Sequence, residues 1–421
     1  MKTLKKIADT YNSVSLIVRI ICGLILGAIL GLLFDNLGFV TLLGDLFVGA
    51  LKAIAPVLVF VLVISALAQG NDKLDSRFTT VIALYMVSTF LASVIAVLGS
   101  FIFPQTLKLA ASAEAESVPT GIGEVLGNLF KGMVGNPVGS IVEGRYIGIL
   151  FWAAVLGIAA KKLASDSTKK VMEDLAEIVS QAVRWIINLA PFGIMGLVYG
   201  NVSTNGLAIF SDYGKLLILL VGCMLAVALI VDPLIAFITL KRNPYPLVFR
   251  CLKESGLTAF FTRSSAANIP VNMELCEKLG MDREMYAVSI PLGATINMDG
   301  AAVTIAVMSL AAANTVGISV DLPTALVLSL IATLGACGAS GVAGGSLLLI
   351  PMACSLFGVP ADVAMQVVGV GFIIGVVQDS VETALNSSGD VMFAATAEYA
   401  KWKKEGKSLP TFLGGDTKVD V

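Results

Sequence analysis

Apolar runs long enough to cross a bilayer follow one another through the first 240 residues, and they limit what the chain can fold into. Six of them stand out, at 15–34, 40–68, 79–103, 146–163, 175–200 and 216–240. Because hydrocarbon offers no water to backbone groups, each run must form a helix that satisfies its own hydrogen bonds. With 57% hydrophobic and 14% charged residues, the chain is predicted to be an all-α polytopic membrane protein.

Several function classes are disfavoured by composition. The chain has no histidine, which excludes a Ser–His nucleophile pair, a histidine metal site and a histidine proton relay. Its six cysteines occur singly and are expected to be reduced and buried. A net charge of −2 gives no reason to expect a nucleic-acid partner. We therefore predict a protein that is not an enzyme and carries no cofactor.

Basic residues mark alternate connections between the apolar runs. Few lie after the first and fifth runs, whereas clusters follow the second, fourth and sixth runs and the last helix. The positive-inside rule then places both termini in the cytoplasm and the 104–145 connection outside. The first run is too long for a signal peptide and is interpreted as a retained span. The clustered residues are Lys73, Arg77, Lys161, Lys162, Lys169, Lys170, Lys241, Arg242, Lys401, Lys403, Lys404 and Lys407.

The last third of the chain contains two interrupted apolar segments. Residues 252–285 are broken at 262–270, and residues 324–357 are broken at 338–346, where Gly and Ser gather. Such breaks suit tips at which two half-helices meet and leave backbone groups free. A helix with a buried acid follows each tip, so the pattern occurs twice and predicts an inverted repeat with a transport site between its halves.

Acidic residues within these segments are the strongest functional signal. Asp299 lies in an apolar stretch, and Asp379, Thr383, Asn386 and Asp390 fall at i, i+4, i+7 and i+11, on one helix face. A carboxylate in hydrocarbon costs at least about 2.5 kcal/mol, so such an acid usually has a function. Two structural alternatives remain: an acid can pair with Lys or Arg on another helix, and small residues can serve close helix packing.

The charge balance of this region predicts ion coupling. Asp299, Asp379, Glu382 and Asp390 against Arg263 give a net charge of −3 if all five ionise, so the site needs cations. Sodium prefers oxygen ligands, which the Asn297–Gly300 segment offers through side chains and unwound carbonyls. Half-helix N-termini at the tips suit a substrate carboxylate, while Asp379 suits a substrate ammonium.

These motifs resemble the dicarboxylate/amino acid:cation symporter family, the glutamate-transporter-like proteins. The specific matches are the Thr262–Ser265 tip and the Pro291–Gly300 run, and the resemblance covers nearly the whole chain. It implies eight transmembrane helices, two re-entrant helical hairpins, a homotrimer in the bacterial inner membrane and an elevator-type mechanism. Residues 1–250 would then be mainly scaffold, although spans three and six move with the transport core, 251–400 that core, and 401–421 a cytoplasmic tail.

The resemblance also implies roles for individual residues. One sodium site would use Gly293, Asn297, Asn386 and Asp390; a second would use Thr295 and Ala339; a third would use Tyr85, Ser88, Thr89, Asn297 and Asp299. Substrate would be held by Ser264, Ser265, Val342, Asp379, Glu382, Thr383 and Asn386.

Three positions depart from members that carry acidic substrates. Those members have arginine where Glu382 stands, threonine where Ala301 stands and glycine where Ser346 stands. An acid at 382 repels a second substrate carboxylate and accepts a hydrogen bond from a hydroxyl. We therefore expect a sodium-coupled symporter of small neutral amino acids, with serine and threonine favoured.

Three other functions are compatible with parts of this sequence. The first is a sodium- or proton-coupled symporter of acidic amino acids or C4-dicarboxylates, which needs Arg263 to bind the second carboxylate. The second is a channel, which needs a continuous polar path. The third is an intramembrane protease using Ser264 or Ser340, disfavoured because no His or Ser–Lys pair is evident.

Overall fold

The computed structural model describes residues 11, 13–34, 36–69, 76–109, 127, 130–339 and 344–419. Within them, six helices are long and apolar enough to cross a membrane. The predicted class, an all-α polytopic membrane protein, is thereby confirmed. One of the six joins two predicted spans in a continuous run of 51 residues, so the expected number of eight transmembrane helices stays a prediction. The six are Gly38–Ala68, Arg77–Ile102, Tyr146–Leu163, Ala190–Leu240, Arg283–Thr315 and Ala361–Lys404.

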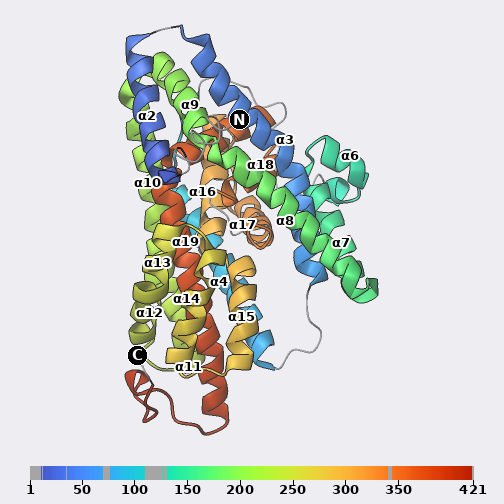
Figure 1. Ribbon diagram of the computed structural model, residues 1–421, viewed down its shortest axis with the longest axis vertical. Coiled ribbons are helices and arrows are strands. Elements are labelled where there is room, and N and C mark those ends of the chain that lie inside the picture. Colours follow the sequence, from blue (N-terminus) through green and yellow to red (C-terminus); the bar gives the residue numbers. More distant parts are fainter. Residues whose placement is uncertain are drawn as a thin grey trace.

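One group of helices forms the outer layer seen in blue and green in Figure 1. Its closest pair is α2 and α9, which glycine brings together: a Cβ on Gly23 would lie 2.1 Å from the Pro191 carbonyl oxygen. Helix α3 packs on α7, α8 and α9. The members are α2 (Leu16–Leu33), α3 (Gly38–Ala68), α6 (Pro137–Val142), α7 (Tyr146–Leu163), α8 (Asp166–Asn188) and α9 (Ala190–Asn205).

The predicted fifth span, 175–200, is wrong as a single helix. The chain forms α8 and α9 instead, separated at Leu189, and α8 begins nine positions earlier than predicted at Asp166. The Ser165 hydroxyl caps α8 by accepting from the Thr168 N–H at 3.4 Å. Only Ala176, Ser180, Val183 and Ile187 of α8 are buried, at helical spacing, so this helix is amphipathic and its start was missed by a search for apolar runs.

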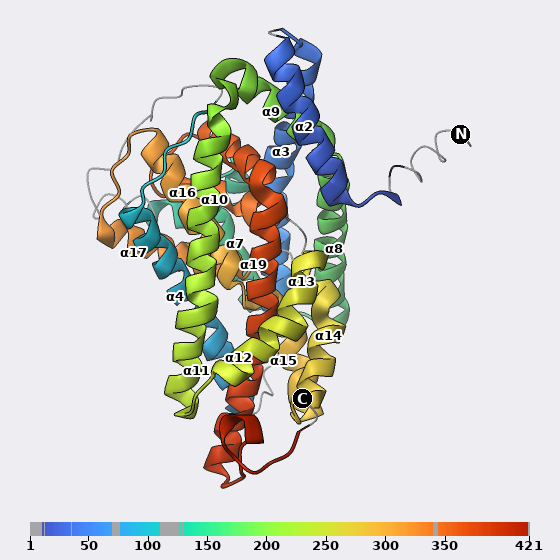
Figure 2. The same ribbon diagram turned by 90° about the vertical axis from the view of Figure 1, so that its left-hand side faces the viewer.

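A second group surrounds two central helices. Helices α16 (Asp299–Thr315) and α19 (Ala361–Lys404) pack together and against α4 (Ser76–Ile102) and α10 (Ile209–Ala226). Helix α10 continues through the π-helical turn η2 (Val227–Val231) into α11 (Asp232–Leu240). Figure 2 shows α10 and α19 running side by side through this core.

The first interrupted segment folds as a helical hairpin. Helix α12 (Tyr245–Cys251), the π-turn η3 (Leu252–Gly256) and α13 (Leu257–Thr262) lead to the tip, and α14 (Ser265–Lys278) returns. The chain reverses at Arg263, which adopts φ of 52°, an uncommon value for a residue with a Cβ. The predicted break at 262–270 is too wide, since α14 resumes at Ser265 and contains Pro270. Helix α15 (Arg283–Ile296) follows.

The second interrupted segment also reverses direction. Helix α17 (Leu322–Ala336) leads to the tip, and the 3-10 turn η4 (Ser346–Leu349) with α18 (Ile350–Ser355) leads away. Helices α17 and α18 pack on each other and on α16. Residues 340–343, including Val342 and Ser340, lie outside the described residues.

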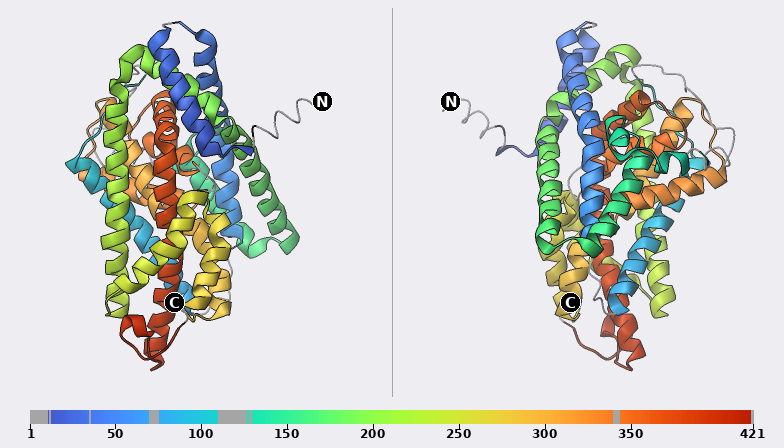
Figure 3. Two further views of the ribbon diagram at one scale, coloured as in Figure 1. Left: turned by 60° about the vertical axis from the view of Figure 1, so that its left-hand side comes forward. Right: turned by 90° about the vertical axis from the view of Figure 1, so that its right-hand side faces the viewer.

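Four core helices have one end each at the lower end of the views in Figure 3. Charged residues connect these ends. The Arg77 Nη1 atom lies 2.8 Å from Asp282 Oδ2 and 3.1 Å from Glu398 Oε2. The hydrogen bond from Arg77 lowers the pKa of the Asp282 carboxyl below its usual value. Lys403 donates to the Leu240 carbonyl oxygen, so the starts of α4 and α15 lie beside the ends of α11 and α19.

Candidate functional site

The unwound segment between α15 and α16 lies at the centre of the site. Asn297 and Met298 have φ, ψ of −92°, 81° and −121°, 52°, which are not helical. The unwinding predicted from Asn297-Met298-Asp299-Gly300 is therefore present. Asn297 Nδ2 donates to the Asn386 carbonyl oxygen and to Asp390 Oδ1, both at 3.1 Å, so the break faces the polar face of α19.

Glycine at position 293 allows this close approach. A Cβ there would lie 2.7 Å from Asp390 Oδ1 and 2.9 Å from the Tyr85 hydroxyl oxygen. Both distances are too short for a carbon atom, so any larger residue would push α15 away from α4 and α19. Gly293, Asn297, Asn386 and Asp390, the first predicted sodium set, therefore lie in one buried cluster.

Three hydroxyl groups of α4 point into the acidic core, two at the Asp299 carboxyl group and one at a backbone carbonyl. The Thr89 hydroxyl donates to Asp299 Oδ1 at 2.8 Å, and Ser88 Oγ lies 2.8 Å from Asp299 Oδ2. The Tyr85 hydroxyl donates to the Asp390 carbonyl oxygen at 3.0 Å. All five residues of the third predicted sodium set thus belong to this cluster, and each is fully buried.

Asp232 is a site residue that the sequence reasoning missed. It begins α11, is 2% exposed, and its Oδ1 lies 2.7 Å from Ser88 Oγ. The signal was present: an acid inside the apolar run 216–240 meets the same criterion that singled out Asp299. The buried site therefore holds five carboxyl groups, those of Asp232, Asp299, Asp379, Glu382 and Asp390.

Asp379 connects the two hairpin tips. Its Oδ2 lies 2.7 Å from Arg263 Nε in an ion pair whose side chains are 9% and 4% exposed. Its Oδ1 accepts from the Gly344 N–H of the second tip at 3.1 Å. Asp379 is therefore paired with an arginine outside its own helix, which is what the structural alternative for a buried acid expects. Asp232, Asp299 and Asp390 contact no basic side chain within the described ranges.

Glu382 is surrounded by neutral hydrogen-bond donors. Its Oε2 accepts from Thr304 Oγ1 at 2.6 Å, Ser346 Oγ at 2.9 Å and Gln378 Nε2 at 2.5 Å. Ser346 was predicted to lie beside this acid, whereas Thr304 and Gln378 were missed. Gln378 precedes Glu382 by one helical turn, so spacing alone indicated that neighbour. Ala301 is buried on α16 without a polar atom in its side chain.

Two further polar side chains of α19 form hydrogen bonds with backbone groups of the site. The Thr383 hydroxyl donates to the Asp379 carbonyl oxygen at 2.8 Å, and Asn386 Oδ1 accepts from the Gly300 N–H at 2.7 Å. The predicted polar face of α19 is thus continuous from Asp379 to Asp390. It contacts the first tip, the second tip and the α15–α16 break in turn.

Residues at both hairpin tips line one cavity of about 210 Å³. Ala266 after the first tip, Thr295 on α15 and Ala339 at the second tip line it, with parts of α3 and α8. The two residues of the second predicted sodium set, Thr295 and Ala339, therefore line one space. At the first tip, Ser264 Oγ caps α14 by accepting from the Ala267 N–H at 3.2 Å, and Ser265 is buried.

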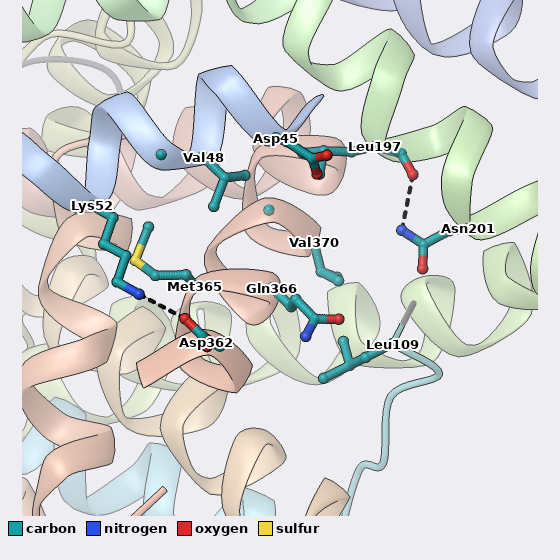
Figure 4. A pocket seen from close by; sticks show the side chains of 12 residues that line it. Asp45, Val48, Lys52, Leu109, Leu197, Asn201, Asp362, Met365, Gln366 and Val370 are labelled. Carbon is teal, nitrogen blue, oxygen red and sulfur yellow. Dashed lines mark hydrogen bonds and ion pairs between the residues drawn. The ribbon is translucent and has the colours of Figure 1, made fainter. Parts of the chain in front are cut away.

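A larger cavity, of about 370 Å³, lies between the outer layer and the start of α19 (Figure 4). Its walls come from α3, α9 and α19, with Leu109 at one side. Across it, Lys52 Nζ and Asp362 Oδ1 form an ion pair of 2.6 Å whose side chains are 49% and 80% exposed. None of the five buried acids lines this cavity, so it is a feature of the boundary between the two helix groups.

The central cluster has polar atoms without partners. Asn297 Oδ1 and Asp390 Oδ2 are buried and accept no hydrogen bond from the residues that the structure describes. A buried oxygen without a donor costs about 1–3 kcal/mol, more when charged. Oxygens of this kind are the ligands that a hard cation prefers, so the residues fit sodium.

Comparison with known proteins agrees with this chemistry. Residues 16–400 match the model of the sodium:dicarboxylate symporter family. The serine/threonine transporter SstT of Bifidobacterium adolescentis is 63% identical over 412 residues, which are 98% of this chain and 96% of that protein. Proteins of the same name from Streptococcus thermophilus and Streptococcus agalactiae are 58% and 57% identical over 95% and 96% of the chain and their full length.

Proposed function

The chain belongs to the sodium:dicarboxylate symporter family, and from this premise we propose that it is a sodium-coupled symporter of small neutral amino acids, serine and threonine first. It is a multi-pass membrane protein and a transporter, not an enzyme. The observation that carries the substrate class is the surrounding of Glu382 by three neutral donors. A carboxylate in that place repels an acidic side chain and can accept a hydrogen bond from a hydroxyl.

The Arg263–Asp379 pair suits the common part of every amino-acid substrate. A zwitterion carries one positive and one negative group, so it can insert at this pair without changing the net charge. Asp379 binds the ammonium, while Arg263 and the tips around Ser264, Ser265 and Val342 bind the α-carboxylate. Thr383 and Asn386 complete the substrate contacts. Breaking the ion pair when substrate enters would also couple binding to movement of both tips, because Asp379 contacts both.

Sodium ions are the coupling partners in this proposal. Asp390, with Gly293, Asn297 and Asn386, contributes to one site, and Thr295 with Ala339 to a second. Tyr85, Ser88, Thr89, Asn297 and Asp299 contribute to a third. If its five carboxyl groups ionise against one guanidinium, the buried site carries excess negative charge, which bound cations offset.

The two helix groups are the scaffold and the transport core of an elevator. Lys52 stands near the middle of α3, yet it pairs with Asp362 at the very start of α19. That offset supports a core displaced along the scaffold toward the end where basic residues gather, which corresponds to an inward-facing state. Both termini are then cytoplasmic, the membrane is the bacterial inner membrane, and by family analogy the protein is a homotrimer.

Uptake into sealed liposomes tests the proposal. Purified protein is reconstituted, and serine uptake is measured with and without an inward sodium gradient, with threonine or aspartate in excess. Uptake that requires sodium, is inhibited by threonine and is unaffected by aspartate is the expected result. Aspartate inhibition would favour an acidic-substrate symporter that uses Arg263, and uptake indifferent to sodium would refute the coupling.

A further inference from the structure

Asp232 is not among the sodium or substrate ligands proposed above, although it stands inside the same buried cluster. It is the first residue of α11 and directly follows the π-helical turn η2, where its N–H bonds the Val227 carbonyl oxygen. A π-turn inserts an extra residue into a helix and is frequent at functional sites. Pro233 comes next in the chain, at the first turn of α11. This local geometry turns the Asp232 side chain toward α4, where it meets Ser88.

The Ser88 hydroxyl lies between two carboxyl groups but has only one hydrogen to donate. Ser88 Oγ lies 2.7 Å from Asp232 Oδ1 and 2.8 Å from Asp299 Oδ2. A serine hydroxyl carries one hydrogen, so it can donate to only one of these oxygens. Thr89 supplies a donor to Asp299, but neither carboxyl has a basic partner among the residues that the structure describes. Two acids thus face each other across one hydroxyl, an arrangement that a cation stabilises.

An unpartnered amide oxygen borders the same space. Asn297 is fully buried, and within the described part of the chain its Oδ1 accepts no hydrogen bond. A Cβ built on Gly389 would lie 2.7 Å from Asn297 Nδ2 and 3.8 Å from Asp299 Oδ2, so the amide and the carboxylate line one wall of the cluster. Within the described ranges, no group of three or more His, Cys, Asp or Glu side chains forms a metal site, so amide and hydroxyl oxygens must complete the shell.

We propose that Asp232 is a ligand of the sodium ion bound at Asp299, so that two carboxylates from different helices hold that ion together. The inference rests on the proposed sodium coupling and adds to it a residue on α11. It also ties α11 to α4 and α16 through the ion. Loading this site is then expected to stabilise the packing of the three helices as well as to supply charge.

Sodium binding measured without substrate tests the assignment. The thermal unfolding midpoint of the purified protein in nanodiscs is followed as sodium replaces choline at constant ionic strength. Asp232→Asn keeps the shape and the hydrogen bond to Ser88 but removes the charge. The sodium concentration for half of the stabilisation should rise at least about tenfold, the size of effect seen when a metal site loses a supporting group. Asp212→Asn, an acid on α10 that pairs with Lys215 away from the cluster, is the matched control and should not change it.

The outcomes separate this inference from the proposed function. If the unchanged protein shows no stabilisation by sodium, the coupling itself is wrong. If it does, and Asp232→Asn has the same sodium dependence, Asp232 is not a ligand and only the inference fails. Should Asp232→Asn not fold, Asp232→Glu retains the charge one methylene further out. A changed ratio of lithium to sodium affinity in that variant supports ligation, and an unchanged ratio overturns it.

Discussion

The two halves of the buried acidic site differ in how completely their carboxyl groups are hydrogen-bonded. On the half proposed to bind substrate, called the substrate side, Asp379 contacts Arg263 and a backbone N–H, and Glu382 accepts from three side chains. On the half proposed to bind sodium, called the cation side, Asp232 and Asp299 share a serine hydroxyl, and Asp390 Oδ2 has no partner among the described residues. Both halves are buried in the same core, so the difference reflects their partners and not their depth.

That difference supports the separate tasks that we propose for the two halves. A carboxyl group already supplied with donors and a counter-charge binds a solute only by exchanging one partner for another, which favours selectivity. A carboxyl group short of partners gains from any cation that reaches it, which favours ion binding. We therefore expect substitutions on the substrate side to change which solute binds, and those on the cation side to change how much sodium is needed.

The largest effect is expected from Asp379→Asn, which breaks the substrate side. The variant removes the proposed ammonium partner and leaves the Arg263 charge buried and unpaired. Loss of a buried charged partner costs about 2–5 kcal/mol, so serine affinity should fall about 30-fold or more. Serine binding by calorimetry at saturating sodium is the measurement. Asp362→Asn, an exposed acid on the same helix, is the control. Normal serine affinity in Asp379→Asn would remove the ammonium partner from the proposal.

Asp390→Ala breaks the cation side. It removes the unpartnered Oδ2 and the acceptor of Asn297 Nδ2, so sodium affinity should fall about tenfold or more. Serine affinity extrapolated to saturating sodium should change far less. The measurement is serine uptake as a function of sodium concentration, with Ser388→Ala, whose hydroxyl only bonds the Ala384 and Leu385 carbonyl oxygens, as control. An unchanged sodium dependence would refute the assignment of Asp390.

Glu382→Arg sharpens the comparison by reversing one charge on the substrate side alone. Thr304, Ser346 and Gln378 lose their acceptor, and a guanidinium faces the substrate side chain. Serine uptake should drop about tenfold, and aspartate should become an inhibitor, with the sodium requirement retained. Competition assays in liposomes measure both, and Glu405→Arg at the exposed end of α19 is the control. Undiminished preference for serine would mean that Glu382 does not select the substrate.

The smallest effect is expected from the ion pair between the helix groups, which belongs to neither half of the site. Lys52 and Asp362 are largely exposed, and such pairs contribute about 0.2–1 kcal/mol. Lys52→Ala, Asp362→Ala and the double variant should each change the serine uptake rate by no more than about fivefold. A double-mutant cycle gives the coupling. A coupling well above 1 kcal/mol would show that this pair controls the transport cycle.

Local patterns predicted much of this molecule because they report on properties of single helices. Apolar runs identified most spans, and they failed at α8, where only one face is apolar. The Gly and Ser breaks marked both tips, and the spacing of Asp379, Thr383, Asn386 and Asp390 placed four polar residues on one face of α19. The Asn-Met-Asp-Gly segment was expected to unwind, and it does.

The sequence by itself determined the membrane class, the two hairpins and four of the five buried acids, since hydropathy and helical period are local properties of the chain. Only the tertiary structure decided which groups face each acid. Arg263 and Asp379 are 116 positions apart, Thr304 and Glu382 are 78 apart, and Ser88 and Asp232 are 144 apart. Such contacts depend on how helices from distant parts of the chain pack, and no residue spacing encodes that packing. The division between a saturated substrate side and an unsaturated cation side therefore became visible only in the folded molecule.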